Sequence, residues 1–62
     1  MHQETITIIS ETINRLIILS QSEQRYALYA GDSLLQKIAL SKVEAYNNAI
    51  KILQSTLLQE NT

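Results

Sequence analysis

Residues 35–57 carry apolar side chains at steps of three and four, the spacing that places side chains on one face of an α-helix. Polar residues such as Glu44 and Lys51 fall on the other face, so the segment is predicted to form an amphipathic helix rather than one buried on all sides. The stripe consists of Leu35, Ala39, Val43, Tyr46, Ile50, Leu53 and Leu57. It constrains the fold more than any other feature of the chain.

The apolar surface of this predicted helix is wider than one partner helix can cover. At about 100° per residue, side chains beside the stripe extend it to roughly half of the helix circumference. These flanking side chains are Leu34, Ile38, Ala45 and Ile52. More than one neighbouring helix is therefore expected.

The first half of the chain repeats the helical spacing and predicts a helix over residues 4–30. The apolar positions are Ile6, Ile9, Ile13, Leu16 and Ile17. Residues 5–9 also alternate and contain β-branched side chains, which is typical of a short strand. We favour the helix because no second segment offers a strand with which residues 5–9 could pair.

A polar stretch, residues 20–25, interrupts the apolar stripe of the first helix. No core residue is expected within it. The stretch contains neither Gly nor Pro, and Ala27 and Leu28 resume the stripe at the phase set by Ile13. One continuous helix is therefore favoured, with a break near Ser22 as the alternative.

The midpoint of the chain carries the signals of a turn. Gly31, the only glycine, is followed by Asp32 and Ser33, and Ser33 with Gln36 has the spacing of a capping box. We predict a turn at residues 31–33 and a second helix over residues 33–58, with a frayed tail at 59–62. Two arms of about 28 residues, roughly 40 Å long, then pack antiparallel as an αα-hairpin.

The short length of the chain predicts self-association. A domain of 62 residues buries only about 60% of its unfolded surface, and without cysteine it has no disulfide or thiolate metal site to stabilise it. We expect an all-α fold in which two antiparallel hairpins form a homodimeric four-helix bundle. Its core and dimer contacts are predicted to be Ile9, Ile13, Leu16, Ile17, Leu35, Ala39, Val43, Tyr46, Ile50, Leu53 and Leu57.

The residue types argue against an enzyme. There is no cysteine, the single His2 is near one end, and the six acidic residues are too scattered for an acid–base pair or a metal site. No cofactor is expected. No apolar run is long enough for a membrane span and no signal peptide is evident, so a cytoplasmic protein is expected.

Net charge argues against nucleic acid as the main partner. The chain carries a net charge of −1, and Glu44 lies between Lys37 and Lys51 on the exposed helix face. RNA binding remains the alternative, because small acidic hairpin dimers such as the plasmid Rop protein bind RNA on a face of the bundle. A structural subunit of a larger assembly is a third hypothesis.

Candidate residues for binding another protein lie near the turn and within the second helix. Arg25, Tyr26 and Tyr29 have the composition of an interaction hot spot. Lys42 falls inside the apolar arc of the second helix. In one interpretation its stem packs there while its ammonium group reaches water or a carboxylate of another helix. In the other it sets the register or the choice of a partner helix.

The segment KVEAYNNAI, residues 42–50, resembles the pattern K-[IV]-E-A-Y-x-x-A-[IL] of small helical-hairpin proteins encoded by phages and mobile elements of Gram-positive bacteria. Asn47 and Asn48 stand where such segments often carry charged residues. The resemblance implies an accessory protein that acts by binding an unidentified protein. One such role is inhibition of a host enzyme or of an antiviral defence system.

Overall fold

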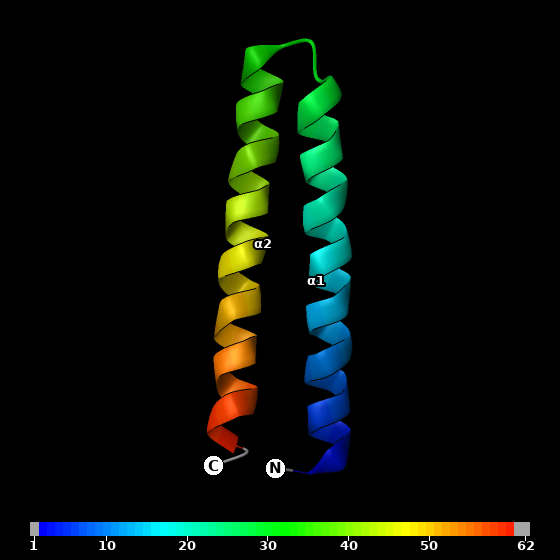
Figure 1. Ribbon diagram of the computed structural model, residues 1–62, viewed down its shortest axis with the longest axis vertical. Coiled ribbons are helices and arrows are strands. Elements are labelled where there is room, and N and C mark those ends of the chain that lie inside the picture. The colour runs from blue at the N-terminus through cyan, green and yellow to red at the C-terminus, as the bar shows by residue number, and fades with distance from the viewer. Residues whose placement is uncertain (1, 61–62) are drawn as a thin grey trace.

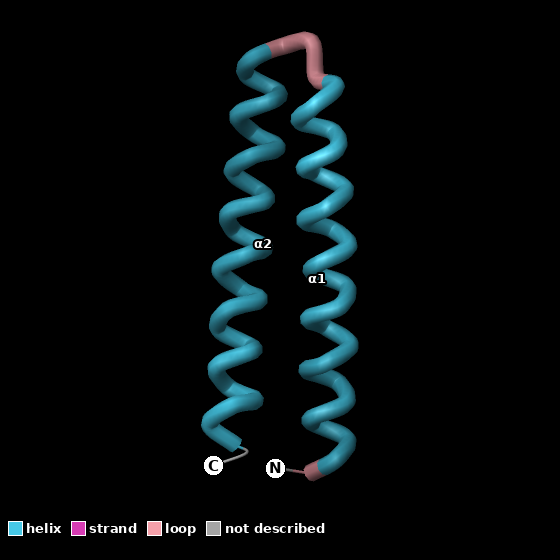
Figure 2. The backbone as a smooth tube through the Cα atoms, viewed as in Figure 1, coloured by secondary structure: helices cyan, strands magenta, loops and turns pink. Residues whose placement is uncertain are grey.

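The computed structural model describes residues 2–60, which form an all-α hairpin (Figure 1). Helix α1 spans Gln3–Tyr29 and helix α2 spans Ser33–Glu60. The two helices run antiparallel along their full lengths, joined by residues 30–32 at one end (Figure 2). The predicted helical hairpin is confirmed, and the strand alternative for residues 5–9 is wrong because this segment belongs to α1.

Helix α1 runs through Ser22 without a break. The polar stretch nevertheless contributes to the core, contrary to the sequence expectation. Ser20 is only 2% exposed and lies seven residues from both Ile13 and Ala27, which are also buried. A seven-residue step keeps side chains on the same helix face, so Ser20 occupies a core position that hydrophobicity alone does not reveal.

The C-terminal end of α2 extends further than predicted. Gln59 and Glu60 are helical, whereas the expected helix ended at residue 58 and the expected frayed tail began at 59. Residues 61 and 62 of that tail lie outside the described residues.

The start of α2 is capped by Asp32. The backbone N–H of Leu34 donates to Asp32 Oδ1 at 2.7 Å, and the N–H of Gln36 donates to the Asp32 carbonyl at 3.0 Å. These are the two contacts of an N-cap residue, and the carboxylate is also favoured by the positive end of the helix dipole. The predicted capping box of Ser33 and Gln36 is wrong, because the helix begins one residue earlier than that motif requires.

Gln36 instead ties the two helices together at the turn. Its side-chain Nε2 donates to the carbonyl oxygen of Ala27 at 3.2 Å. The last four carbonyls of a helix lack partners within the helix, so this bond satisfies one of them. The end of α1 and the start of α2 are thereby held side by side.

Replacing Gly31 by alanine is expected to stabilise the hairpin. Gly31 does not have a positive φ, and a Cβ added there meets no atom within 4 Å. The substitution lowers the conformational entropy of the unfolded chain and introduces no strain into the folded one. The free energy of unfolding should therefore rise by about 0.4–1 kcal/mol. A thermal melt followed by circular dichroism should show an increase of a few degrees, and a lower melting temperature would contradict this description of the turn.

Few side chains are fully enclosed between the two helices. The buried apolar residues are Ile13, Ala27, Ala39 and Ile50. Among the other predicted core positions, all but one are half-buried: Ile9, Leu16, Ile17, Val43, Tyr46, Leu53 and Leu57. Leu35 is the exception, because it is 43% exposed and lies at the edge of the contact between α1 and α2 rather than within it. A single hairpin therefore leaves Leu35 without a covering partner.

The hairpin is elongated and exposes much surface. Its radius of gyration is 14.4 Å, compared with about 10.6 Å expected for a compact domain of this length. Its accessible surface is 4861 Å², compared with roughly 4,000 Å² for a typical folded monomer of 7.0 kDa. About 800 Å² more surface is therefore exposed than a typical monomer of this mass would leave.

Candidate functional site

The hairpin exposes many large apolar side chains. Twelve of those in the described residues are exposed, from Leu35 at 43% to Tyr29 at 87%. They are Ile8, Ile18, Leu19, Tyr26, Leu28, Tyr29, Leu34, Leu35, Ile38, Leu40, Ile52 and Leu58. Single exposed apolar residues are ordinary on protein surfaces, whereas a contiguous set indicates an interaction site. The arrangement of these twelve side chains therefore determines whether they form such a site.

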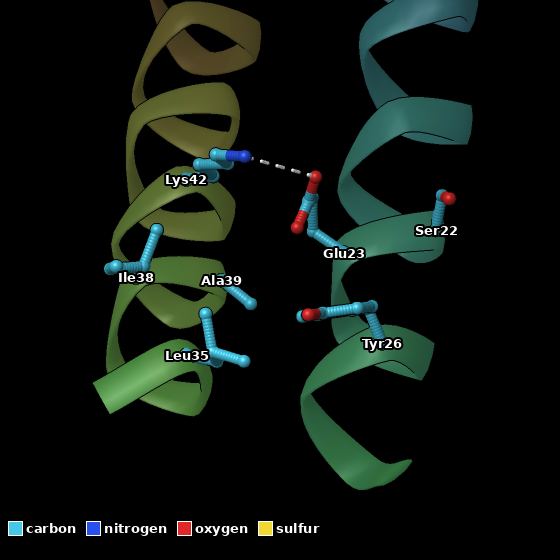
Figure 3. A pocket seen from close by; sticks show the side chains of 7 residues that line it. All are labelled: Ser22, Glu23, Tyr26, Leu35, Ile38, Ala39 and Lys42. Carbon is cyan, nitrogen blue, oxygen red and sulfur yellow. Dashed lines mark ion pairs between the residues drawn. The ribbon is translucent and has the colours of Figure 1, made fainter. Parts of the chain in front are cut away.

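Both helices contribute to a shallow groove of about 250 Å³ near the turn (Figure 3). Tyr26 extends from α1 towards α2 across this groove. The lining residues are Ser22, Glu23, Tyr26, Leu35, Ile38, Ala39 and Lys42. Tyr26 and Ile38 therefore lie on the same side of the hairpin.

The apolar side of this groove continues along the hairpin away from the turn. Leu19 lies seven residues before Tyr26, and Ala45 and Ile52 follow Ile38 at seven-residue steps. Seven residues are close to two full turns, so these side chains share the face of the groove. We name this surface the open apolar face and define it as Leu19, Tyr26, Leu35, Ile38, Ala45 and Ile52. All six residues are exposed.

The opposite side of the hairpin carries a hydrogen-bonded polar cluster, beside which Leu28 and Leu40 are exposed. The Ser20 hydroxyl donates to Asn47 Oδ1 at 3.0 Å, and Gln24 Nε2 donates to Ser20 Oγ at 3.2 Å. Gln24 lies about 160° around α1 from Tyr26. Asn47 lies about 140° around α2 from Lys42. This hydrogen-bonded cluster thus distinguishes the opposite side of the hairpin from the open apolar face.

An ion pair crosses the open apolar face. Lys42 Nζ lies 3.6 Å from Glu23 Oε1, drawn as the dashed line in Figure 3, and the two side chains are 53% and 25% exposed. Lys42 therefore meets a carboxylate of the other helix, which is one of the two roles that the sequence suggested. An ion pair this exposed adds little to stability, about 0–1 kcal/mol, so its value in the single hairpin is small.

The structure separates the tyrosines that the sequence grouped together. Tyr26 lies on the open apolar face, whereas Tyr29 is 87% exposed and lies about 60° further around α1, away from α2. Arg25 lies four residues before Tyr29, and Ile18, 61% exposed, lies seven before Arg25. We name Ile18, Arg25 and Tyr29 the outer ridge. Ile18 is not among the binding residues predicted from the sequence, although its seven-residue spacing from Arg25 could have identified it.

Within residues 2–60, no group of three His, Cys, Asp or Glu side chains is placed to hold a metal ion. In the same range, neither helix has a segment that is both long and apolar enough to cross a membrane.

Comparison of the chain with protein-family models, with curated proteins and with solved structures found no match.

Proposed function

We propose that the chain is a small, non-enzymatic protein-binding module that works as a homodimer in the cytosol, two hairpins forming a four-helix bundle. The observation that carries this proposal is the open apolar face, a set of exposed apolar side chains along one side of the hairpin that is crossed by the Glu23–Lys42 ion pair. Covering this face with a second copy removes apolar area from water, which is the main driving force for association.

The surface area supports a dimer of ordinary size. The roughly 800 Å² of excess surface equals the area that each partner typically buries in a stable protein–protein interface. A second copy seated on the open apolar face would bring the exposed surface per chain to the value expected for a folded domain.

The outer ridge supports binding of another protein. Its side chains lie away from α2 and from the open apolar face, so they remain accessible in the proposed bundle. Tyr and Arg supply large contact areas at low entropic cost and are the residues most enriched in hot spots. The likeness of residues 42–50 to phage and mobile-element hairpins supports an accessory role, such as inhibition of a host enzyme or antiviral defence protein.

Alanine substitutions should separate the two surfaces. Tyr29→Ala or Arg25→Ala is expected to weaken partner binding by at least about 2 kcal/mol, roughly thirtyfold, without changing helicity or dimer mass. Tyr26→Ala, in contrast, should weaken the dimer. Affinity capture from a lysate, with the isolated partner then titrated against each variant, measures this, and loss of the dimer in Tyr29→Ala would contradict the assignment.

Nuclease treatment of the same lysate tests the alternative of RNA binding. Capture that survives nuclease supports the protein-binding proposal, since phosphate-driven binding also falls steeply with salt. Sub-micromolar RNA affinity at physiological salt, lost in Lys37→Glu, would favour the RNA-binding hairpin instead. Long, indefinitely growing assemblies of the purified chain would favour the third hypothesis, a structural subunit.

A further inference from the structure

We infer that the second copy packs on the open apolar face with both turns at the same end of the bundle, and that Glu23 and Lys42 set this orientation. The inference rests on the proposed dimer and adds its geometry. Two hairpins placed face to face have two symmetric arrangements. In the same-end arrangement the twofold axis is parallel to the helices, and in the opposite-end arrangement it is perpendicular to them.

The cross-helix contacts define which residues lie at the same height along the hairpin. Ser20 bonds Asn47, and Glu23 pairs with Lys42, so the members of each pair lie at the same position along the hairpin axis. Because the helices are antiparallel, the two residue numbers of such a pair have a nearly constant sum, here 67 and 65. Leu19 in α1 is accordingly level with the α2 segment between Ala45 and Ala49.

The same-end arrangement places α1 of each copy against α2 of the other without changing heights. Glu23 of one copy then faces Lys42 of the second copy, and Lys42 of the first faces Glu23 of the second. The two ion pairs close into a ring of four alternating charges in which each charge has two opposite neighbours. A ring of this kind keeps every charge paired when the interface excludes water, which a buried charge requires.

The opposite-end arrangement leaves the ion pair within each hairpin but gives Glu23 and Lys42 no opposite charge in the second copy. It places α1 of one copy against α1 of the other, running in opposite directions. The two helices then cross-match about their midpoint, which is residue 16 for Gln3–Tyr29. Glu23, seven residues towards the turn, would then face residue 9 of the second copy, an isoleucine. Burial of a carboxylate against an apolar side chain is costly, so the charge pattern disfavours this arrangement.

Side-chain size favours the same orientation. In the same-end arrangement, Leu16 and Leu19 of one copy lie against Ala45 and Ala49 of the other, so large side chains meet small ones. The opposite-end arrangement brings the leucine-bearing stretches of the two α1 helices together and the two alanine-bearing stretches of α2 together. Alternating large and small residues fill an interface without voids, whereas two facing alanine surfaces leave space.

Charge reversal tests the ring. Glu23→Lys alone and Lys42→Glu alone should each weaken the homodimer at least about tenfold, because like charges then face each other. An equimolar mixture of the two variants should form heterodimers, and the double variant Glu23→Lys/Lys42→Glu should dimerise like the original chain. Helicity should persist throughout because Lys42 is exposed and Glu23 only half-buried in the single hairpin. Unchanged dimerisation of both single variants would overturn the proposed role of the charges.

Distance measurement tests the orientation directly. The chain has no cysteine, and Gly31→Cys accepts a nitroxide label because nothing lies within 4 Å of a Cβ there. In the same-end dimer the two labels should be within about 25 Å by double electron–electron resonance, since neighbouring helices of a bundle are 8–10 Å apart. A distance near the 46 Å length of the hairpin would overturn the inference while leaving the dimer intact. A labelled chain that sediments as a 7.0 kDa monomer would overturn both the inference and the proposed function.

Discussion

Ile50→Asp is expected to unfold the hairpin. Ile50 is 9% exposed on the α2 side of the contact with α1, and an aspartate there combines lost apolar burial with an unpaired buried charge. We expect a loss of at least about 4 kcal/mol, comparable with the roughly 3–9 kcal/mol that stabilises a domain of this size. Circular dichroism at 222 nm should show that most of the helical signal is lost.

Leu58→Asp is the matched control for Ile50→Asp. It introduces the same charge into the same helix, at a side chain that is 67% exposed, so helicity and melting temperature should change little. If Ile50→Asp instead kept full helicity and the mass of the original chain, the observed contact between α1 and α2 would be wrong.

Leu19→Asp is expected to separate the proposed dimer into single chains. Leu19 is 46% exposed in the hairpin and belongs to the open apolar face. The substitution occurs once in each copy, so the interface loses two apolar side chains and gains two charges. We expect a loss of at least about 3 kcal/mol, more than a hundredfold in the dissociation constant of the dimer. Analytical ultracentrifugation measures this constant.

Leu28→Asp is the control for this variant. Leu28 is 77% exposed on the same helix and lies about 160° around it from Tyr26, away from the open apolar face. Its substitution should leave the dimer intact. Equal loss of dimer in both variants would show that a general effect of charge, rather than this face, controls association.

The hairpin follows from the sequence because its signals are local. The stripe that begins at Leu35 and the equal length of the two arms identify two amphipathic helices and their antiparallel arrangement. Periodicity identifies which side chains of a helix share a face, and hydrophobicity indicates which face is buried. No long-range information is needed for either step.

Details that depend on the partner helix did not follow from the sequence. Ser20 lies on the buried face of α1, where Asn47 and Gln24 satisfy its hydroxyl, and a pattern of apolar residues gives no weight to serine. The cap at Asp32 competes with the equally plausible Ser33, and only the backbone geometry distinguishes them.

The candidate site was recognised only in part. The sequence singled out Lys42 and Tyr26, but their common groove with Ile38 depends on how the two helices are rotated relative to each other. Both apolar stripes are wide, so the sequence leaves this rotation open. The separation of Tyr26 from Tyr29 is a consequence of the same rotation.

Sedimentation equilibrium of the unmodified chain over a range of micromolar concentrations tests the proposed dimer most directly. The proposal predicts a mass of about 14 kDa, twice the 7.0 kDa of the chain, with dissociation appearing only on dilution. A fully helical species that remains at 7.0 kDa throughout this range would contradict it.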